Sequence, residues 1–242
     1  MGSDVEILVA IQGSSARTFS HPIRTIVVNG RGVAKSRNAV VDAAAGRYLL
    51  FCDDDVDVNL PGVLAGVCHL QASQHAIVLG RGVDSTGRLR KSYPNGVSRL
   101  TRFNSAKAAT YEMLIDVAQV RRAGIRFDER FGAGAELYLA DEYIFVTDLL
   151  AAGLTGEVIP EVFGTHPGMS SGERWGTDRD MHVRAVAFNR VFGRAAPIVR
   201  ILFALKQAAR LGDWRRVLSF VTDNGQPPPL PSVDNPSHKN ER

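Results

Sequence analysis

Short apolar runs alternate with amphipathic segments along the first eighty residues. The apolar runs are rich in β-branched or aromatic side chains and stop at polar or glycine-containing turns, as is typical of strands. The expected elements are strands at 5–11, 23–28, 48–52 and 76–79, and helices at 32–45 and from Pro61. The run at 48–52 is wholly apolar, which predicts a strand buried on both faces. This alternation indicates an α/β fold with a mainly parallel sheet flanked by helices.

The later part of the chain carries mostly helix signals. Residues 80–104 are polar and rich in glycine and arginine, which favours loops and a short hairpin. After it we expect a strand at 109–117 and helices at 118–124, at 139–152 and, two or three in number, within 181–222. Residues 224–242 contain five prolines and cannot offset the entropy of ordering. The expected parts are one domain over 1–177, its C-terminal helical extension over 178–223 and a disordered tail over 224–242.

Composition narrows the class of protein. The 242 residues are 45% hydrophobic and 22% charged, a profile of soluble globular chains that excludes membrane-spanning and collagen-like proteins. Two cysteines cannot form a disulfide scaffold, and the first apolar run is too short for a signal peptide, so we expect a cytoplasmic protein. The net charge of +4 is carried by basic residues spread along the chain, which indicates no nucleic-acid partner. An amphipathic, basic segment at 198–210 either covers the core or lies at the inner face of a membrane.

Three consecutive carboxylates follow the apolar run at 48–52. Because side chains alternate along a strand, Asp53 and Asp55 point to one side and Asp54 to the other. Three adjacent negative charges repel one another unless a cation or arginines lie close. Open α/β sheets bind ligands at the carboxyl ends of their strands, and hard divalent cations favour carboxylates together with phosphate oxygens. The triplet therefore predicts a metal and phosphate site, with a solvated acidic turn as the alternative.

Three segments in order carry short motifs. Residues 32–39 read GVAKSRNA and residues 48–55 read YLLFCDDD. Residues 127–135 read FDERFGAGA, an acidic pair follows at 141–142, and residues 165–172 read THPGMSSG. In this order the segments resemble the DXD-containing block, the acceptor-side loop with its acidic pair, and the later histidine segment of the family-2 glycosyltransferases of the GT-A fold. The resemblance covers about residues 23–172.

The resemblance implies a metal-dependent, inverting transfer of a sugar from a nucleoside-diphosphate sugar to a hydroxyl acceptor. The cofactor would be Mg²⁺ or Mn²⁺, and the acceptor a sugar or lipid-linked glycan of polysaccharide biosynthesis. The expected site residues are Arg37, Asp53, Asp54 and Asp55 for the nucleotide sugar, Asp53, Asp55 and His166 for the metal, and Gly132, Gly134 and Trp175 for the acceptor. Helix-surface packing for Arg37 and core packing for Trp175 are the alternatives.

The acidic pair is reversed relative to the family's usual Glu-Asp order. Either Asp141 or Glu142 would be the catalytic base, and since adjacent helical positions point about 100° apart, only one can reach the hydroxyl. Compared with the family, residue type favours Asp141 and the distance to Gly153 favours Glu142, and of the two we expect Asp141 to be the base. A structural acid at a helix start is the further alternative.

The N-terminal part also departs from the family pattern. Residues 12–22 are too few for the long helix that usually joins the first two strands, so we expect an abbreviated N-terminus. Two other functions stay open for this reason. One is a nucleotidyltransferase on a related α/β fold, although residues 12–17 are a poor phosphate loop, and the other is a non-catalytic relative of the GT-A enzymes.

Overall fold

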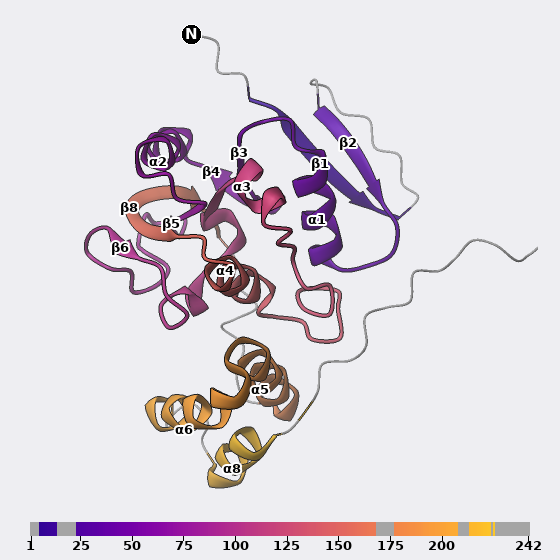
Figure 1. The fold of residues 1–242 in the computed structure, drawn as a ribbon, viewed down its shortest axis with the longest axis vertical. Coiled ribbons are helices and arrows are strands. Elements are labelled where there is room, and N and C mark those ends of the chain that lie inside the picture. Colours follow the sequence, from indigo (N-terminus) through magenta and orange to yellow (C-terminus); the bar gives the residue numbers. More distant parts are fainter. Residues whose placement is uncertain (1–4, 14–22, 168–176, 208–212, 224, 226–242) are drawn as a thin grey trace, which may run out of the picture.

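The computed structural model describes residues 5–13, 23–167, 177–207, 213–223 and 225. Helices and strands alternate through most of this length (Figure 1). The strands are β1 (Ile7–Gln12), β2 (Ile23–Val28), β3 (Tyr48–Leu50), β4 (Asp57–Val58), β5 (Ile77–Val83), β6 (Ser98–Arg99), β7 (Met113–Asp116) and β8 (Gly156–Thr165). The helices are α1 (Val33–Ala43), α2 (Leu60–Ser73), α3 (Val117–Arg122), α4 (Asp141–Ala151), α5 (Asp178–Phe192), α6 (Ala196–Lys206) and α8 (Trp214–Thr222).

Most strands join one six-stranded sheet in the order β3-β7-β5-β8-β4, with β6 paired to β8. Within it only the β5–β8 pair is parallel, and β1 and β2 form a separate parallel pair. The sheet is therefore mixed, whereas the alternating pattern had predicted a mainly parallel one. The reason lies in the connections: residues 84–112 lead from β5 to β7 without a crossover helix, so the chain reverses and pairs antiparallel.

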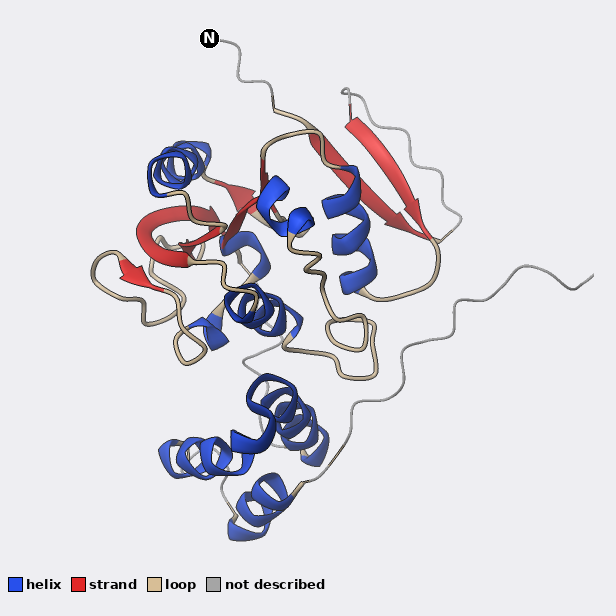
Figure 2. Ribbon diagram, in the orientation of Figure 1, coloured by secondary structure: helices blue, strands red, loops and turns tan. Residues whose placement is uncertain are grey.

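Helices cover both faces of the six-stranded sheet (Figure 2). Successive residues of β7 show the two sides: Leu114 packs with α2, and its neighbours Met113 and Ile115 pack with α1, α3 and α4. Strand β3 lies at the sheet edge and its residues are only half-buried, so the expectation of a strand buried on both faces was wrong. This edge position leaves the aspartates that follow β3 open to solvent.

Strand β8 is absent from the sequence-based expectations because a proline interrupts its pattern. Leu79 pairs with Val158 and Arg81 with Val162, so β8 carries a bulge that contains Pro160. Proline cannot donate to a strand ladder and is accommodated at such bulges. The bulge lets β8 curl over β5 and deliver its end to the aspartate triplet (Figure 1).

The C-terminal helices pack on the α/β core through α5. One side of α5 contacts α4 through Val183 and Val186, and its other side contacts α6 and α8 through Met181 and Ala185. The prediction of two or three helices within residues 181–222 is confirmed by α5, α6 and α8. No helix within the described ranges has the length and apolar character needed to cross a bilayer.

Candidate active site

The buried guanidinium of Arg37 joins motifs that lie about a hundred residues apart. Arg37 is on α1 and is 9% exposed. Its Nη1 donates to Asp141 Oδ2 and, over 3.2 Å, to Glu142 Oε1. Its Nη2 donates to Thr110 Oγ1 over 2.5 Å and lies 3.7 Å from Asp53 Oδ1. The alternative that Arg37 only packs on a helix surface is wrong, because this one cation faces three carboxylates.

The acidic pair occupies the first turn of α4. Ala140 precedes it in the left-handed conformation, with φ of 80°, and the helix N-terminus favours negative charge. The two carboxylates differ in access: the Asp141 side chain is 4% exposed and that of Glu142 is 20% exposed. The pair thus presents one buried and one partly accessible carboxylate.

Burial and shared charge separate the acidities of the pair. Burial, reinforced by the adjacent Glu142, raises the pKa of Asp141 well above its usual range, and Arg37 opposes this only partly. Burial acts in the same direction on Glu142, but Arg37 and the hydroxyl of Thr110 outweigh it and lower the net pKa of Glu142. Glu142 is therefore ionised at neutral pH.

Asn38 fixes the loop that follows α3. Its Nδ2 donates to the carbonyl of Phe127 over 3.0 Å, and the Phe127 amide donates back to Asn38 Oδ1 over 2.8 Å. Asn38 Nδ2 also lies 3.2 Å from Glu129 Oε1. The Phe127 ring lies 5.6 Å from the Arg37 guanidinium. The neighbouring residues Arg37 and Asn38 thus tie α1 to both later motifs.

Two glycines allow the turn at residues 132–135 to pack closely against the Arg37 cluster and the start of α1. Gly132 and Gly134 have φ of 96° and 83°, which strains other residues. A Cβ on Gly132 would lie 2.7 Å from Asp141 Cγ, and one on Gly134 would lie 3.1 Å from the amide nitrogen of Gly32. The turn also accepts a hydrogen bond at Ala133 from the first residue of α1. Of the predicted acceptor residues, Gly132 therefore lies against Asp141 and Gly134 against the backbone at the start of α1.

The aspartate triplet divides between two partners. Asp53 faces Arg37, and Asp55 Oδ2 lies 3.3 Å from His166 Nε2. Partial burial raises the pKa of Asp53, and Arg37 counteracts that rise. Asp54 is exposed. Repulsion within the triplet is thus relieved by one cation on one side and by an imidazole on the other.

His166 is held firmly at the end of β8. Its amide donates to the Val83 carbonyl over 3.0 Å, and Arg90 Nη1 donates to the His166 carbonyl over 2.6 Å. The ring of Tyr111 stacks on the imidazole with centroids 5.7 Å apart and planes 13° apart. Trp175, the remaining predicted site residue, lies outside the described residues.

Comparison with known proteins shows the family of the chain. Residues 2–128, more than half of the chain, match the family described as Glycosyl transferase family 2. The chain belongs to this family. No curated protein sequence matches it significantly.

Solved structures show the same fold as this family-2 chain. Residues 1–349 of S. aureus TarS in complex with UDP have 17% identity and a TM-score of 0.55, with 87% of this chain and 63% of that chain covered. The same TarS residues in complex with UDP-GlcNAc have 16% identity and a TM-score of 0.54, with 89% and 66% covered. A mycobacterial protein has 15% identity and a TM-score of 0.51, with 77% and 64% covered. The chain therefore spans less than two thirds of these solved chains, and the GT-A-like α/β fold expected from the sequence is confirmed.

Two of the three predicted metal ligands, Asp55 and His166, face each other. Within the described ranges, no group of three or more His, Cys, Asp and Glu side chains is arranged to hold a metal ion. The carboxylate of Asp55 and the imidazole of His166 face each other, whereas Asp53 turns to Arg37. Mg²⁺ in phosphate-handling sites is commonly held by one or two carboxylates, with phosphate oxygens and water completing its shell. The carboxylate and the imidazole therefore fit a cation that also binds the oxygens of a diphosphate.

Some residues of the site carried no distinct signal in the sequence. Thr110 and Tyr111 lie within the segment predicted as a strand, and Arg90 lies among several arginines of the polar segment 80–104. Their roles depend on which residues face them in the folded chain: Thr110 faces Arg37, and the other two face His166.

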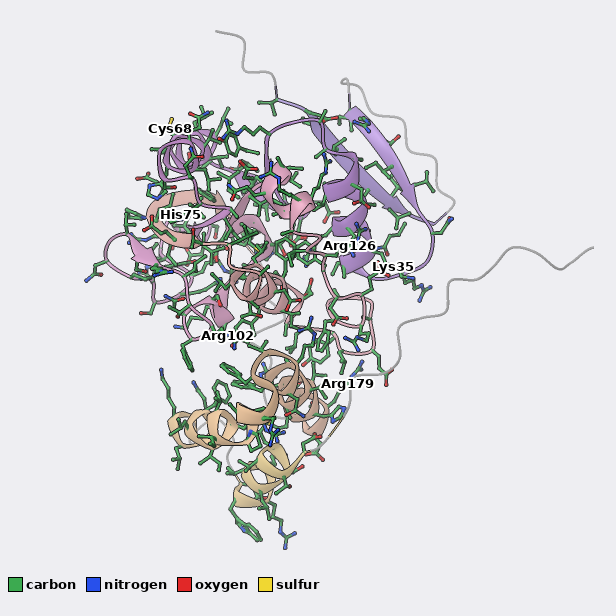
Figure 3. The ribbon with its side chains drawn as sticks, viewed as in Figure 1. Lys35, Cys68, His75, Arg102, Arg126 and Arg179 are labelled. Carbon is green, nitrogen blue, oxygen red and sulfur yellow. The ribbon has the colours of Figure 1, made fainter. Side chains whose placement is uncertain are left out.

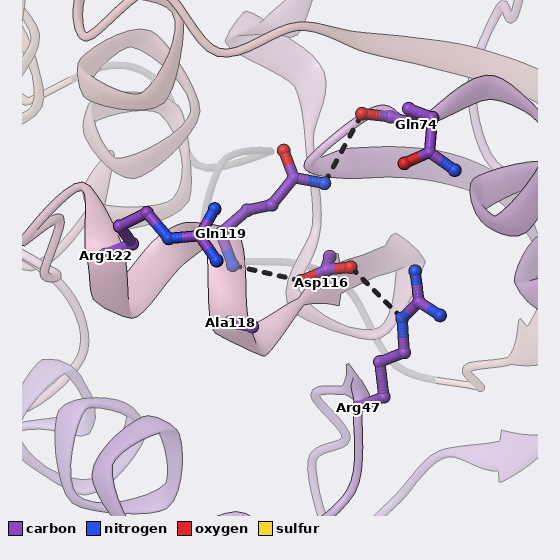
Figure 4. A pocket seen from close by; sticks show the side chains of 6 residues that line it. All are labelled: Arg47, Gln74, Asp116, Ala118, Gln119 and Arg122. Atoms are coloured by element: carbon purple, nitrogen blue, oxygen red, sulfur yellow. Dashed lines mark hydrogen bonds and ion pairs between the residues drawn. The ribbon is translucent and has the colours of Figure 1, made fainter.

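A separate pocket of about 410 Å³ lies away from this site (Figure 4). It is lined by Arg47, Gln74, Asp116, Ala118, Gln119 and Arg122. Inside it, Arg47 Nε is 3.5 Å from Asp116 Oδ2, and the other oxygen of Asp116 caps α3 by accepting from Gln119. These contacts join β7 and α3 to the β3 edge, and the pocket shares no residue with the candidate active site.

Proposed function

We propose that this chain transfers a sugar from a nucleoside-diphosphate sugar to a hydroxyl acceptor with inversion and with a divalent cation. The observation that carries the proposal is that Asp53 of the triplet and both carboxylates of the acidic pair face the buried Arg37, in a chain of glycosyl transferase family 2. TarS structures with UDP and with UDP-GlcNAc support a nucleotide-sugar donor.

The donor diphosphate would bind at the triplet. Asp55 and His166 would hold Mg²⁺ or Mn²⁺, while Arg37 orients Asp53 and Asp54 stays open to solvent on the donor side. When bound, such a cation neutralises the charge that develops on the departing diphosphate. His166 cannot swing away easily, because its backbone is tied to β5 and its ring is stacked on an aromatic neighbour.

Glu142 is the better candidate for the catalytic base. Its carboxylate is the more accessible of the pair and is ionised, so it can accept the proton of the attacking hydroxyl. Asp141 is buried beneath Gly132 and orients Arg37. The acceptor would approach over the turn at Gly132 and Gly134, and Trp175 remains a predicted stacking residue. A sugar or lipid-linked glycan suits this open side of the site.

The test is turnover of a panel of nucleotide sugars with Mn²⁺, measured as release of free nucleoside diphosphate. We expect Glu142→Gln to lower kcat by about 10²–10⁴-fold, as for loss of a general base. Asp55→Asn should abolish cation-dependent donor binding in calorimetry. The matched control is Asp57→Asn, which removes the charge of an exposed side chain two residues after Asp55. This variant should bind and turn over the nucleotide sugar as the native chain does.

Three results would contradict the proposal. Release of pyrophosphate from a nucleoside triphosphate and a sugar phosphate, without release of nucleoside diphosphate from any nucleotide sugar, would instead support a nucleotidyltransferase. Absence of nucleotide-sugar binding with Mn²⁺ would indicate a non-catalytic relative. A larger loss in Asp141→Asn than in Glu142→Gln, with both proteins folded, would reassign the base to Asp141.

A further inference from the structure

Helix α6 exposes its aliphatic side chains and buries its arginine. Large apolar residues recur at helical spacing on its outer face and are 45–70% exposed. They are Ile198, Ile201, Leu202 and Leu205. By contrast Arg200 is 2% exposed and donates from Nη1 to the carbonyl of Asp223. A helix whose outer face meets water has the opposite distribution.

Helix α8 repeats the arrangement beside it. Trp214 and Leu218, one turn apart, are 69% and 53% exposed, whereas Phe220 is buried against α5 and α6. We call these six exposed residues of α6 and α8 the apolar surface. The two helices lie at the end of the molecule opposite the β1–β2 pair, and side chains project outward from them (Figure 3).

The same segment carries the net charge of the protein. Residues 193–223 contain six basic and two acidic side chains, an excess equal to the +4 of the whole chain. The remainder of the chain is therefore electrically balanced. Arg194 and Lys206, at the two ends of α6, and Arg215 on α8 are exposed. The partner of the apolar surface must thus accept both apolar side chains and a concentrated positive charge.

We propose that the apolar surface docks on an anionic lipid bilayer. Amphipathic helices with basic flanks and Trp and Leu on the apolar side lie in the plane of the interface, with the apolar side chains among the acyl chains. Anionic headgroups attract basic residues near the bilayer surface. A second copy of the chain fits less well, because symmetric contact would bring two such positive segments together. The helices are too short to span the bilayer, so they lie on it.

Docking would hold the active site at a set orientation to the lipid surface. The α5 helix contacts the apolar-surface helices on one side and α4, which begins with the acidic pair, on the other. The docking itself is independent of the reaction proposed above, and it is measured without any sugar donor.

The test is co-sedimentation of the full chain with vesicles of phosphatidylcholine, alone or mixed with phosphatidylglycerol. We expect binding to the mixed vesicles, weakened by salt, and little binding to the neutral ones. Leu202→Glu with Leu205→Glu should abolish it. The matched controls are Leu202→Glu alone, which should weaken binding, and Leu64→Glu, which places the same single charge on an exposed leucine of α2, 47% exposed, and should bind nearly as the native chain does. Lys206→Gln with Arg215→Gln should weaken binding roughly 25-fold, at about fivefold for each charge.

Two further measurements distinguish loss of binding from misfolding of a variant. Circular dichroism should show the same helix content in every variant. In a Trp175→Phe background, emission from Trp214 should shift to shorter wavelength when mixed vesicles are added, as the indole leaves water. Failure of the native chain to bind mixed vesicles overturns the proposal, as does undiminished binding by the Leu202→Glu/Leu205→Glu variant. The proposal is also overturned if analytical ultracentrifugation shows a dimer of the native chain that dissociates in the Leu202→Glu/Leu205→Glu variant. In that case a second copy of the chain covers the apolar surface.

Discussion

Replacing Arg37 by methionine tests whether one buried cation organises the site. The change keeps an apolar stem of similar length and removes the guanidinium. Asp141, Glu142 and Thr110 then lose their shared partner. Asp53 is half exposed, so its contact at 3.7 Å adds little. Breaking a buried ion pair from one side costs about 3–5 kcal/mol of the free energy of unfolding, and we expect this loss.

The matched control is Arg126→Met. Arg126 also binds a carboxylate through two hydrogen bonds, to Asp42 at 2.7 and 2.8 Å, but both side chains are about half exposed. Water screens that pair, so its removal should cost no more than about 1 kcal/mol. Adding Glu142→Gln to Arg37→Met should recover at least about 1 kcal/mol, because the ionised carboxylate that is left without its guanidinium disappears.

The loss of stability in the Arg37→Met variant should depend on pH. Arg37 holds the pKa of Glu142 below its ordinary 4.5, so this carboxylate stabilises the native chain above that value and loses its contribution as the pH falls. The penalty of Arg37→Met should therefore be largest near pH 7 and shrink as the pH falls below 4.5, where Glu142 of the native chain becomes protonated. Urea unfolding at pH 7 and at about pH 3 measures it. A penalty equal to that of Arg126→Met, or one that is constant with pH, would refute the reasoning.

Three further predictions concern the surroundings of this cluster. Gly132→Ala should lower the free energy of unfolding by about 2–5 kcal/mol, since it adds backbone strain and a clash with the Asp141 carboxylate. Gly87→Ala, with φ of 81° and open space around it, should cost only about 1 kcal/mol in the same urea unfolding measurement. Equal losses in the two variants would show that the clash at Gly132 is relieved. Asn38→Ala should lower the free energy of unfolding by about 2–4 kcal/mol by leaving a buried backbone amide and carbonyl unpaired, and a loss under about 1 kcal/mol would contradict this clamp. Burial and the nearby Asp53 and Asp55 raise the pKa of Cys52 to about 11, so near pH 8 only about one Cys52 thiol in a thousand is ionised. Iodoacetamide should therefore label Cys68 first, which mass spectrometry measures. Faster labelling of Cys52 would contradict the prediction.

Local patterns predicted individual elements well. The helix expected at 32–45 is α1, the proline at the start of α2 and the glycine after α4 mark real ends, and the aspartate triplet does follow a strand. These features depend on backbone geometry and side-chain spacing within a few residues. The family resemblance on three short motifs is likewise confirmed, because residues 2–128 match glycosyl transferase family 2.

Strand direction and the course of β8 could not be predicted in this way. A strand has the same apolar pattern whether its neighbour runs parallel or antiparallel, and the connection decides between them. Pro160 hides β8 because a bulge is visible only when the partner strand is present. The roles within the site depend on the same long-range contacts.

By itself, then, the sequence determined which segments become helices and strands and which side chains could carry charge to a ligand. Only the tertiary structure decided that Arg37 is the shared partner of both acidic motifs, that Asp53 and Asp55 serve different neighbours, and that the apolar side of α6 faces outward. The physical reason is that burial and charge pairing are properties of positions brought together from distant parts of the chain, and each side chain acquires its environment only there.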